Sequence, residues 1–417
     1  MLYNAYSQRL SGQQTARSRK ESVPHLNVMV VGKAGAGKTM FVRTLCERLK
    51  CNIIQGTFKE SKSMALKEQL RATEDFYSVS MYVEENGERI SFTLIDTPGF
   101  DDGLAIDHQL NFVAKYIDYQ FELTLIEETK VKRDTKAFDT HIHACLYFMD
   151  TTSNCLSDTD RYALRVLSSR VNVIPVIGKA DTLTVTQRES LKRGFRNDIF
   201  DALQIPIYGY IEMNEDDEKD EKSSEAPERG SFTMTHILHM LRECISDNDD
   251  DDDDDDCDGD ARTMVDYLEQ MPYTVFSYEE DPDTGRPLTI LRDSLFPQQQ
   301  MSSQQQQDTE PHELTSSEPA SDTLSATPQQ PHKKYNNKRN TSKNMLGRRY
   351  PWAVIECCNP DHCDFEKLRT MIVTSHRDML RIDTFERFYE KYRTEQLLKR
   401  RVNKLMATTT KCDKVLV

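Results

Sequence analysis

Residues 32–39 have the types and the spacing of a phosphate-binding loop. An apolar run at residues 26–31 leads into this loop and a helix-like stretch at residues 40–50 follows it, the context in which a G-x-x-x-x-G-K-[ST] pattern is meaningful. The glycines let backbone N–H groups approach phosphate oxygens, the lysine neutralises the β- and γ-phosphates, and the hydroxyl ligates Mg²⁺. The alternative is a chance glycine-rich turn. The predicted nucleotide-binding residues of this segment are Gly32, Lys33, Ala34, Gly35, Ala36, Gly37, Lys38, Thr39 and Met40.

A second motif, Asp96-Thr97-Pro98-Gly99, ends the apolar run at residues 90–95. A D-x-x-G pattern alone is common, but it follows the phosphate loop on the next predicted strand pair. Asp96 is therefore predicted to hold Mg²⁺ through water, and the Gly99 N–H to contact the γ-phosphate. The predicted metal-binding residues are Thr39 and Asp96.

A third motif, Lys179-Ala180-Asp181, follows the apolar run at residues 171–177. A carboxylate here can accept hydrogen bonds from both the N1–H and the amino group of guanine. Adenine lacks this donor pattern and would leave the carboxylate unpaired. The lysine stem would lie along the base. The three motifs together predict that the chain binds GTP or GDP with Mg²⁺.

An α/β fold of the P-loop NTPase type must position these motifs. Buried strand runs alternate with stretches long enough for crossover helices, which favours a mostly parallel six-stranded sheet with helices on both faces. The Asn86-Gly87 dipeptide predicts a hairpin, and hence one antiparallel edge. The predicted strands are residues 26–31, 77–83, 90–95, 143–149, 171–177 and 205–210, and the predicted crossover helices are residues 109–132, 158–170 and 186–203.

Charge and composition vary strongly along the 417 residues. The net charge is −15, but eleven aspartates lie within residues 247–260, so the rest of the chain is close to neutral. This balance predicts no nucleic-acid partner. The hydrophobic fraction is only 37%, so part of the chain lies outside any core. Residues 214–229 and 247–260 are predicted to be solvated acidic loops, and residues 294–345, rich in Gln, Ser, Thr and Pro, a disordered insertion.

The N-terminal segment and the cysteines bear on the compartment. Residues 1–25 are predicted to be a flexible arm, and no apolar stretch approaches the length of a signal core or membrane span. Ten scattered cysteines fit a reducing cytosol and predict a cytoplasmic protein. Four neighbouring side chains could hold a metal, although buried or idle thiols are the favoured interpretation: Cys357, Cys358, His362 and Cys363.

With these motifs in place, the chain resembles the septins. The most specific match is C-terminal: residues 347–352 (GRRYPW), 362–369 (HCDFEKLR) and 389–393 (YEKYR). Residues 116–121 (YIDYQF), 145–148 (CLYF) and 173–183 (VIPVIGKADTL) resemble septins as well. The resemblance implies a septin-type GTPase domain over residues 26–293. It also implies a septin-specific α+β element, resumed at residues 346–398 and followed by a short basic tail at residues 399–417.

The septin resemblance implies a GTP-binding cytoskeletal subunit that hydrolyses GTP slowly and joins other septin subunits in hetero-oligomeric filaments. Such a protein would act as a scaffold in cell division, at the cell cortex or at the septum. The alternatives are a regulatory GTPase switch acting as a monomer, and a septin subunit that holds GTP without hydrolysing it.

The same resemblance assigns roles to single residues. Arg348 would stack on or cover the guanine base, which suits its planar guanidinium. Thr73 lies where hydrolytically active septins carry a switch threonine, so it would be the catalytic residue that touches the γ-phosphate. The alternative for Thr73 is an ordinary loop threonine. The implied interface residues are Asn154, Trp352 and His362.

Residues 384–406 predict an amphipathic helix whose apolar positions do not persist as heptads. These apolar positions are Phe385, Phe388, Tyr392, Leu397 and Leu405. Two basic groups could meet an anionic membrane surface, with a solvated helix end as the favoured alternative for the second. They are Arg17, Arg19 and Lys20 in the arm, and Lys399, Arg400, Arg401 and Lys404 near the C-terminus.

Overall fold

The computed structural model describes residues 23–61, 75–101, 106–132, 138–149, 155–210, 234–246, 255–281, 286–288 and 345–413. Several predicted features lie outside these residues: most of the N-terminal arm, Thr73, Asn154, the acidic segment 214–229, residues 247–254 of the aspartate-rich run, and the insertion up to residue 344. The described residues before 289 and those after 345 pack as one unit.

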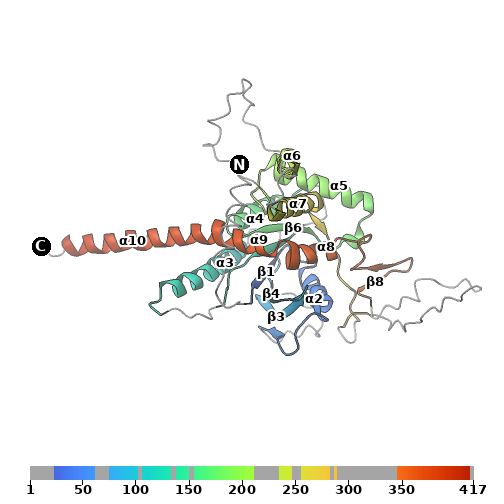
Figure 1. Cartoon of the computed structure of the whole chain (residues 1–417), viewed down its shortest axis with the longest axis horizontal. Coiled ribbons are helices and arrows are strands. Elements are labelled where there is room, and N and C mark those ends of the chain that lie inside the picture. Colours follow the sequence, from blue (N-terminus) through green and yellow to red (C-terminus); the bar gives the residue numbers. More distant parts are fainter. Residues whose placement is uncertain are drawn as a thin grey trace, which may run out of the picture. The chain divides into compact units, whose positions relative to one another are not determined.

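A seven-stranded sheet forms the centre of this unit (Figure 1). Strand β1 lies in the middle and pairs in parallel with β4 and β5, while β2 and β3 make an antiparallel edge. The mostly parallel sheet with one antiparallel edge is therefore confirmed, but the predicted number of strands is one too low. In spatial order the strands are β2 (Lys59–Glu60), β3 (Tyr77–Glu85), β4 (Glu88–Asp96), β1 (His25–Gly32), β5 (Ala144–Met149), β6 (Val173–Ile177) and β7 (Tyr273–Thr274).

The strand predicted at residues 205–210 is wrong. This apolar segment folds into successive turns, closed by bonds such as Tyr210 N–H to the Ile207 carbonyl. Pro206 has no N–H to donate to a ladder, and Gly209 has a φ of 83°. The short strand β7 pairs with β6 instead. A buried apolar run is thus compatible with a packed turn as well as with a strand.

The inner strands are buried on both faces, because helices cover both sides of a parallel sheet. All residues of β5 and β6 are buried, as their continuous apolar sequences predict. Strand β3 alternates buried and half-buried residues and joins β4 through Asn86 and Gly87, both at positive φ. This two-residue turn confirms the predicted hairpin.

The first helices surround the sheet as predicted, with shifts of a few residues at their ends. Helices α4 and α5 begin at side-chain caps, Ser157 and Thr184, and Gln187 completes a capping box on α5. The helices are α2 (Lys38–Leu49), α3 (Ile106–Thr129), α4 (Asp158–Ser168) and α5 (Val185–Arg196), which continues into the π-helical turn Asn197–Ala202.

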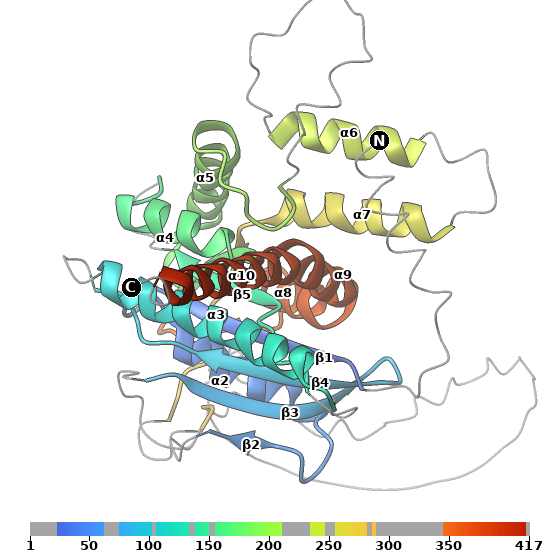
Figure 2. The same cartoon turned by 90° about the vertical axis from the view of Figure 1, so that its left-hand side faces the viewer.

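The predicted acidic loop at residues 247–260 is wrong in its last part. Two further helices, α6 (Met234–Ser246) and α7 (Asp255–Gln270), pack side by side (Figure 2), so residues 255–260 form the beginning of α7. Acidic residues favour the first turn of a helix because the macrodipole is positive there. A run of aspartates next to an apolar segment therefore fits a helix start as well as a loop.

The C-terminal element combines a small hairpin with helices, as the predicted α+β element requires. The hairpin is β8 (Gly347–Arg349) and β9 (Val354–Glu356). The helices are α8 (Phe365–Thr370), α9 (Arg377–Asp383) and α10 (Glu390–Asp413), linked by the π-helical turns Met371–Ser375 and Thr384–Tyr389. Among the described helices, none is both long and apolar enough to cross a membrane.

Helix α10 runs beside α3 (Figures 1 and 2). One residue of the predicted apolar stripe, Tyr392, packs on Phe121 of α3 with ring centroids 5.6 Å apart, and polar contacts add to this. Tyr392 and Arg400 both bond to Glu122, and Arg393 pairs with Glu128. Of the five predicted apolar positions Phe388 is buried, Tyr392 is half-buried, and Phe385, Leu397 and Leu405 are exposed. The tail predicted from residue 399 is part of α10 as far as Asp413.

A buried ion pair joins the C-terminal element to the sheet. The Asp364 carboxylate lies 2.8 Å from Lys192 Nζ and accepts the backbone N–H and the hydroxyl of Thr274 in β7. Burial alone would raise the pKa of Asp364, but Lys192 and the Thr274 donors lower it below its usual value. The short strand β7 is thus linked to the start of α8.

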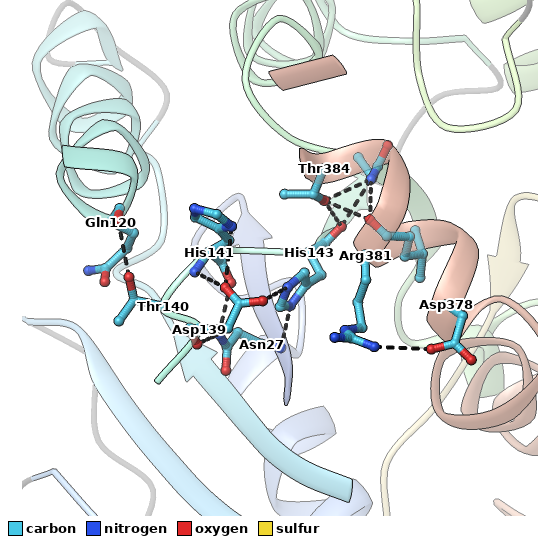
Figure 3. Close-up of polar contacts among 11 residues, drawn as sticks. Asn27, Gln120, Asp139, Thr140, His141, His143, Asp378, Arg381 and Thr384 are labelled. Atoms are coloured by element: carbon cyan, nitrogen blue, oxygen red, sulfur yellow. Dashed lines mark hydrogen bonds and ion pairs between the residues drawn. The ribbon is translucent and has the colours of Figure 1, made fainter. Parts of the chain in front are cut away.

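A second, partly buried cluster lies at the amino ends of β1 and β5, where the buried histidine rings of residues 141 and 143 flank the half-buried Asp139 carboxylate (Figure 3). His143 Nδ1 accepts the Asn27 N–H at 2.9 Å, so Nε2 carries the hydrogen and donates to Asp139 at 3.1 Å. The Thr384 hydroxyl shares its hydrogen between the Leu380 carbonyl at 2.7 Å and the His143 carbonyl at 3.2 Å. This cluster therefore holds the C-terminal element against the start of β5.

Candidate functional site

The loop between β1 and α2 has the backbone of an anion cradle. Gly35 and Gly37 have φ values of 76° and 98°, a region that residues with a Cβ rarely adopt. Gly37 is the N-cap of α2, so the loop leads directly to the positive end of a helix. Several N–H groups can therefore face one anion.

Lys38 reaches back across the loop. Its Nζ donates to the Gly32 and Lys33 carbonyls at 2.9 and 2.8 Å, and the side chain is buried. Burial lowers the pKa of Lys38 to about 8, partly opposed by the Asp96 charge. The ammonium is still charged near pH 7, with few water contacts, so an incoming phosphate would be a strong partner.

The two predicted metal-binding side chains lie together. Thr39 Oγ1 donates to Asp96 Oδ2 at 2.6 Å, although 57 residues separate them in the chain. Both offer oxygen atoms, the ligands that Mg²⁺ prefers, and Mg²⁺ commonly retains several waters. The pair therefore fits Mg²⁺ held by one hydroxyl and by a carboxylate acting through water.

The segment after Asp96 closes against the phosphate loop. The Ala34 N–H donates to the Phe100 carbonyl at 2.9 Å, and the Phe100 N–H to the Gly32 carbonyl at 3.2 Å. A Cβ on Gly99 would lie 2.4 Å from Ala34 Cα, so no larger residue fits here. This contact places the predicted γ-phosphate-sensing backbone beside the loop.

The third motif lies next to the same loop. Lys179 has a left-handed φ of 53° and is exposed, and its Cγ lies about 4.0 Å from where a Cβ on Gly37 would be. The Asp181 side chain is only 1% exposed. Its Oδ2 accepts hydrogen bonds from Arg348 at 2.8 Å and from Tyr350 at 2.5 Å.

Arg348 therefore lies beside Asp181, the carboxylate that is predicted to read the base. Its Nε donates to the Ser277 carbonyl at 2.9 Å, so β8 is tied to the segment after β7. A cavity of about 330 Å³ adjoins it. The cavity is lined by Met40, Tyr278, Glu279, Glu280, Arg348, Arg349 and Tyr350.

The structure describes two of the three predicted interface residues. Trp352 is 80% exposed at the turn between β8 and β9, where a partner could reach it. His362 is half-buried and accepts the Glu356 N–H through Nδ1 at 2.9 Å. Asn154, like the predicted catalytic Thr73, lies outside the described residues.

The alternative metal site at the C-terminal cysteines has no structural support. Cys357 and Cys363 are buried, and burial raises the pKa of both thiols, to about 11 for Cys363. The Cys363 thiol donates to the Cys357 carbonyl. Within the part of the chain that the structure describes, no three His, Cys, Asp or Glu side chains are grouped to hold a metal ion.

Tyr350 is a site residue that the sequence motifs did not single out. Its hydroxyl reaches Asp181 across 169 residues of chain. The available signal was its place two residues after Arg348, directly after β8, because residues two apart point to the same face where the backbone stays extended. That signal does not say which face meets the carboxylate.

Comparison with known proteins shows which family this chain resembles. The septin family model matches residues 23–235 and 291–405. The septin homolog spn3 of Schizosaccharomyces pombe is 28% identical over 389 residues, which cover 92% of this chain and 75% of the relative. Neuronal-specific septin-3 of Danio rerio is 27% identical over 371 residues, covering 89% and 74%.

A solved structure shows the same fold. The septin GTPase domain from Chlamydomonas reinhardtii superposes with a TM-score of 0.50 at 17% identity, covering 90% of this chain and all of that one. This likeness supports the P-loop NTPase architecture described above. The match of the family model to most of the sequence decides the relationship. The chain belongs to the septin family.

Proposed function

We propose that this septin binds GTP and Mg²⁺, hydrolyses GTP slowly, and assembles with other septin subunits. The observation that carries the proposal is the convergence of Lys38, Thr39, Asp96 and Asp181 at the carboxyl ends of β1, β4 and β6. Ligands of α/β sheets bind at this edge. Four side chains from three segments thereby offer one cation, one metal site and one base-reading carboxylate.

The phosphate end would work by charge placement. Lys38 and the N–H groups of residues 35–39 would bind the β- and γ-phosphates, and Thr39 with Asp96 would hold Mg²⁺. When bound, Mg²⁺ neutralises the charge that develops on the phosphates during transfer. The proposed catalytic residue remains Thr73, whose hydroxyl would orient the attacking water.

The base end would select guanine. Asp181 presents a buried carboxylate, and burial makes an unpaired partner costly, so a base without two suitable donors is rejected. Adenine is such a base. The Lys179 stem and the Arg348 guanidinium would cover the two sides of the base.

Assembly is proposed from family membership and from one surface feature. Trp352 is exposed close to the base-binding carboxylate, and large exposed aromatics commonly anchor protein interfaces. A cytoskeletal role at the cell cortex or septum is proposed on the family relationship. Binding of the basic residues Lys399 to Lys404 to an anionic membrane remains a prediction.

The test is nucleotide analysis of the purified full chain together with its sedimentation at low and high salt. GDP bound to a dimer or larger assembly supports the proposal. Protein that retains GTP would contradict slow hydrolysis and support a subunit that binds GTP without hydrolysing it. A monomeric protein that purifies without nucleotide and hydrolyses GTP quickly would contradict assembly and support a monomeric switch.

Two variants test the site itself. Lys38→Ala should purify with less than a tenth of the wild-type nucleotide content, because the phosphates lose their central cation. Asp181→Ala should lose the preference for GDP over ADP. Asp158→Ala is the matched control, since its side chain is fully exposed on α4. Wild-type retention by Lys38→Ala, or intact guanine preference in Asp181→Ala, contradicts the proposed site.

A further inference from the structure

Tyr350 connects the buried base-reading carboxylate to an exposed indole. Its hydroxyl donates to Asp181 Oδ2 at 2.5 Å. Its ring stacks on Trp352, with centroids 5.3 Å apart and planes 17° from parallel. One tyrosine thus contacts a carboxylate that is 1% exposed and an indole that is 80% exposed.

The two oxygens of Asp181 are used unequally. Oδ2 accepts two donors, from Arg348 and Tyr350, whereas Oδ1 is buried and accepts no hydrogen bond from the described residues. A carboxylate oxygen has about two acceptor positions, so Oδ2 is already filled. Guanine offers two parallel donors, so binding both oxygens requires one of the present donors to leave Oδ2.

Arg348 is the donor better suited to leave. Its side chain is about one third exposed, it has other N–H groups, and its Nε can stay on the Ser277 carbonyl. Its planar N–H groups also resemble the donor edge of guanine. Tyr350 has a single O–H donor and only two side-chain torsions. The Tyr350 N–H is bonded to the Ala353 carbonyl at 2.8 Å, which anchors the residue in the turn.

We propose that Tyr350 is a positioning residue for guanine recognition, which holds Asp181 while Arg348 gives way to the base and which transmits base binding to Trp352. The proposal rests on the proposed function, because it requires guanine to bind at Asp181. A carboxylate held at one oxygen by a rigid donor is oriented for a two-point contact. The same ring then links occupancy of the base site to the exposed turn.

The first test compares GDP with inosine diphosphate, whose base lacks the amino group, in the full-length Tyr350→Phe variant. This change removes the hydroxyl and keeps the ring. We expect GDP binding to weaken about tenfold and inosine diphosphate binding less than threefold, because a two-point contact depends more on orientation than a one-point contact. A tyrosine that merely packs the turn would change both affinities equally.

The second test uses Trp352 fluorescence, because the chain contains one tryptophan. Saturating GDP should change the wild-type emission and ADP should not. In Tyr350→Phe, saturating GDP should leave the emission unchanged. The matched control is Tyr119→Phe, an exposed tyrosine on α3, which should behave as wild type in both tests.

Three results would overturn the inference: an unchanged ratio of GDP to inosine diphosphate affinity in Tyr350→Phe, a full Trp352 response to GDP in that variant, or no response to GDP in the wild type. The wild-type measurements hold even where the variant is unstable. Wild-type protein that does not bind GDP at all contradicts the proposed function instead. The two failures are therefore distinguishable.

Discussion

The two edges of the parallel sheet use polar residues for opposite purposes. At the carboxyl edge, the Lys38 ammonium donates to the Gly32 and Lys33 carbonyls, and one buried oxygen of Asp181 accepts no hydrogen bond from the described residues. At the amino edge, both oxygens of Asp139 face histidine nitrogens (Figure 3). At the carboxyl edge, polar groups can still accept or donate bonds to a ligand. At the amino edge, the polar groups bond to one another and so stabilise the fold.

The pKa shifts reflect the same contrast. Burial lowers the pKa of Lys38, so a phosphate bound beside the ammonium would raise that pKa again by stabilising the charged form. Burial alone would raise the pKa of Asp139, but the hydrogen bond from His143 and the nearby His141 lower it well below its usual value. A buried charge whose partners belong to the fold contributes to stability; one that awaits a ligand contributes to binding.

The largest expected effect is at Asp139. Replacing Asp139 by Ala leaves two buried donors without an acceptor, His143 Nε2–H and the His141 backbone N–H, each worth about 1–3 kcal/mol. We expect a loss of about 4 kcal/mol in the free energy of unfolding, measured in urea, with GDP affinity unchanged below the melting temperature. Asp158→Ala should change stability by less than about 0.5 kcal/mol. A stable Asp139→Ala protein that binds GDP poorly would reverse the assignment of the two edges.

Acidification is expected to lower the free energy of unfolding by a smaller amount, through protonation of His376. This buried side chain bonds to the Tyr208 hydroxyl at 3.0 Å, and burial lowers its pKa to about 4. The unfolded state, with a pKa near 6.5, binds the proton more readily. Stability from this group is therefore complete above pH 6.5 and declines by about 3 kcal/mol as the pH falls to 4.

Urea unfolding at a series of pH values measures the slope of the free energy of unfolding against pH. In His376→Phe the slope between pH 6.5 and 4 should be reduced by that amount, whereas His239→Gln, an exposed histidine on α6, should retain it. An identical slope in His376→Phe and wild type would show that other groups cause the acid sensitivity.

The smallest effect is at the carboxyl edge. Because Lys38 has a pKa of about 8 and a phosphate would raise it, binding at pH 9 must take up a proton. We expect GDP to bind about tenfold more weakly at pH 9 than at pH 7. Calorimetry in buffers of different ionisation enthalpy measures both quantities. Lys38→Arg stays charged throughout, so any binding that it retains should not depend on pH; equal pH dependence in both proteins would exclude Lys38 as the cause.

Much of this molecule follows from short stretches of sequence. The phosphate loop is contiguous, so its glycines, Lys38 and Thr39 lie together whatever the rest of the chain does. The continuous apolar runs of β1, β5 and β6 predict buried parallel strands, and parallel strands place the residues that follow them at one edge. This is why Asp96 and Asp181 could be assigned to the same site from their order alone.

The sequence pattern failed where a segment's conformation depended on distant partners. Residues 205–210 have strand-like composition, yet β7, only two residues long, takes the place beside β6. The Asp139 cluster and the Tyr350–Asp181 bond join residues from separate segments of the chain. Their formation depends on how whole elements pack, because side-chain hydrogen bonds need a specific distance and direction. The sequence by itself determined which chemistry this septin carries; the tertiary structure decided which side chains meet, since local patterns do not encode long-range proximity.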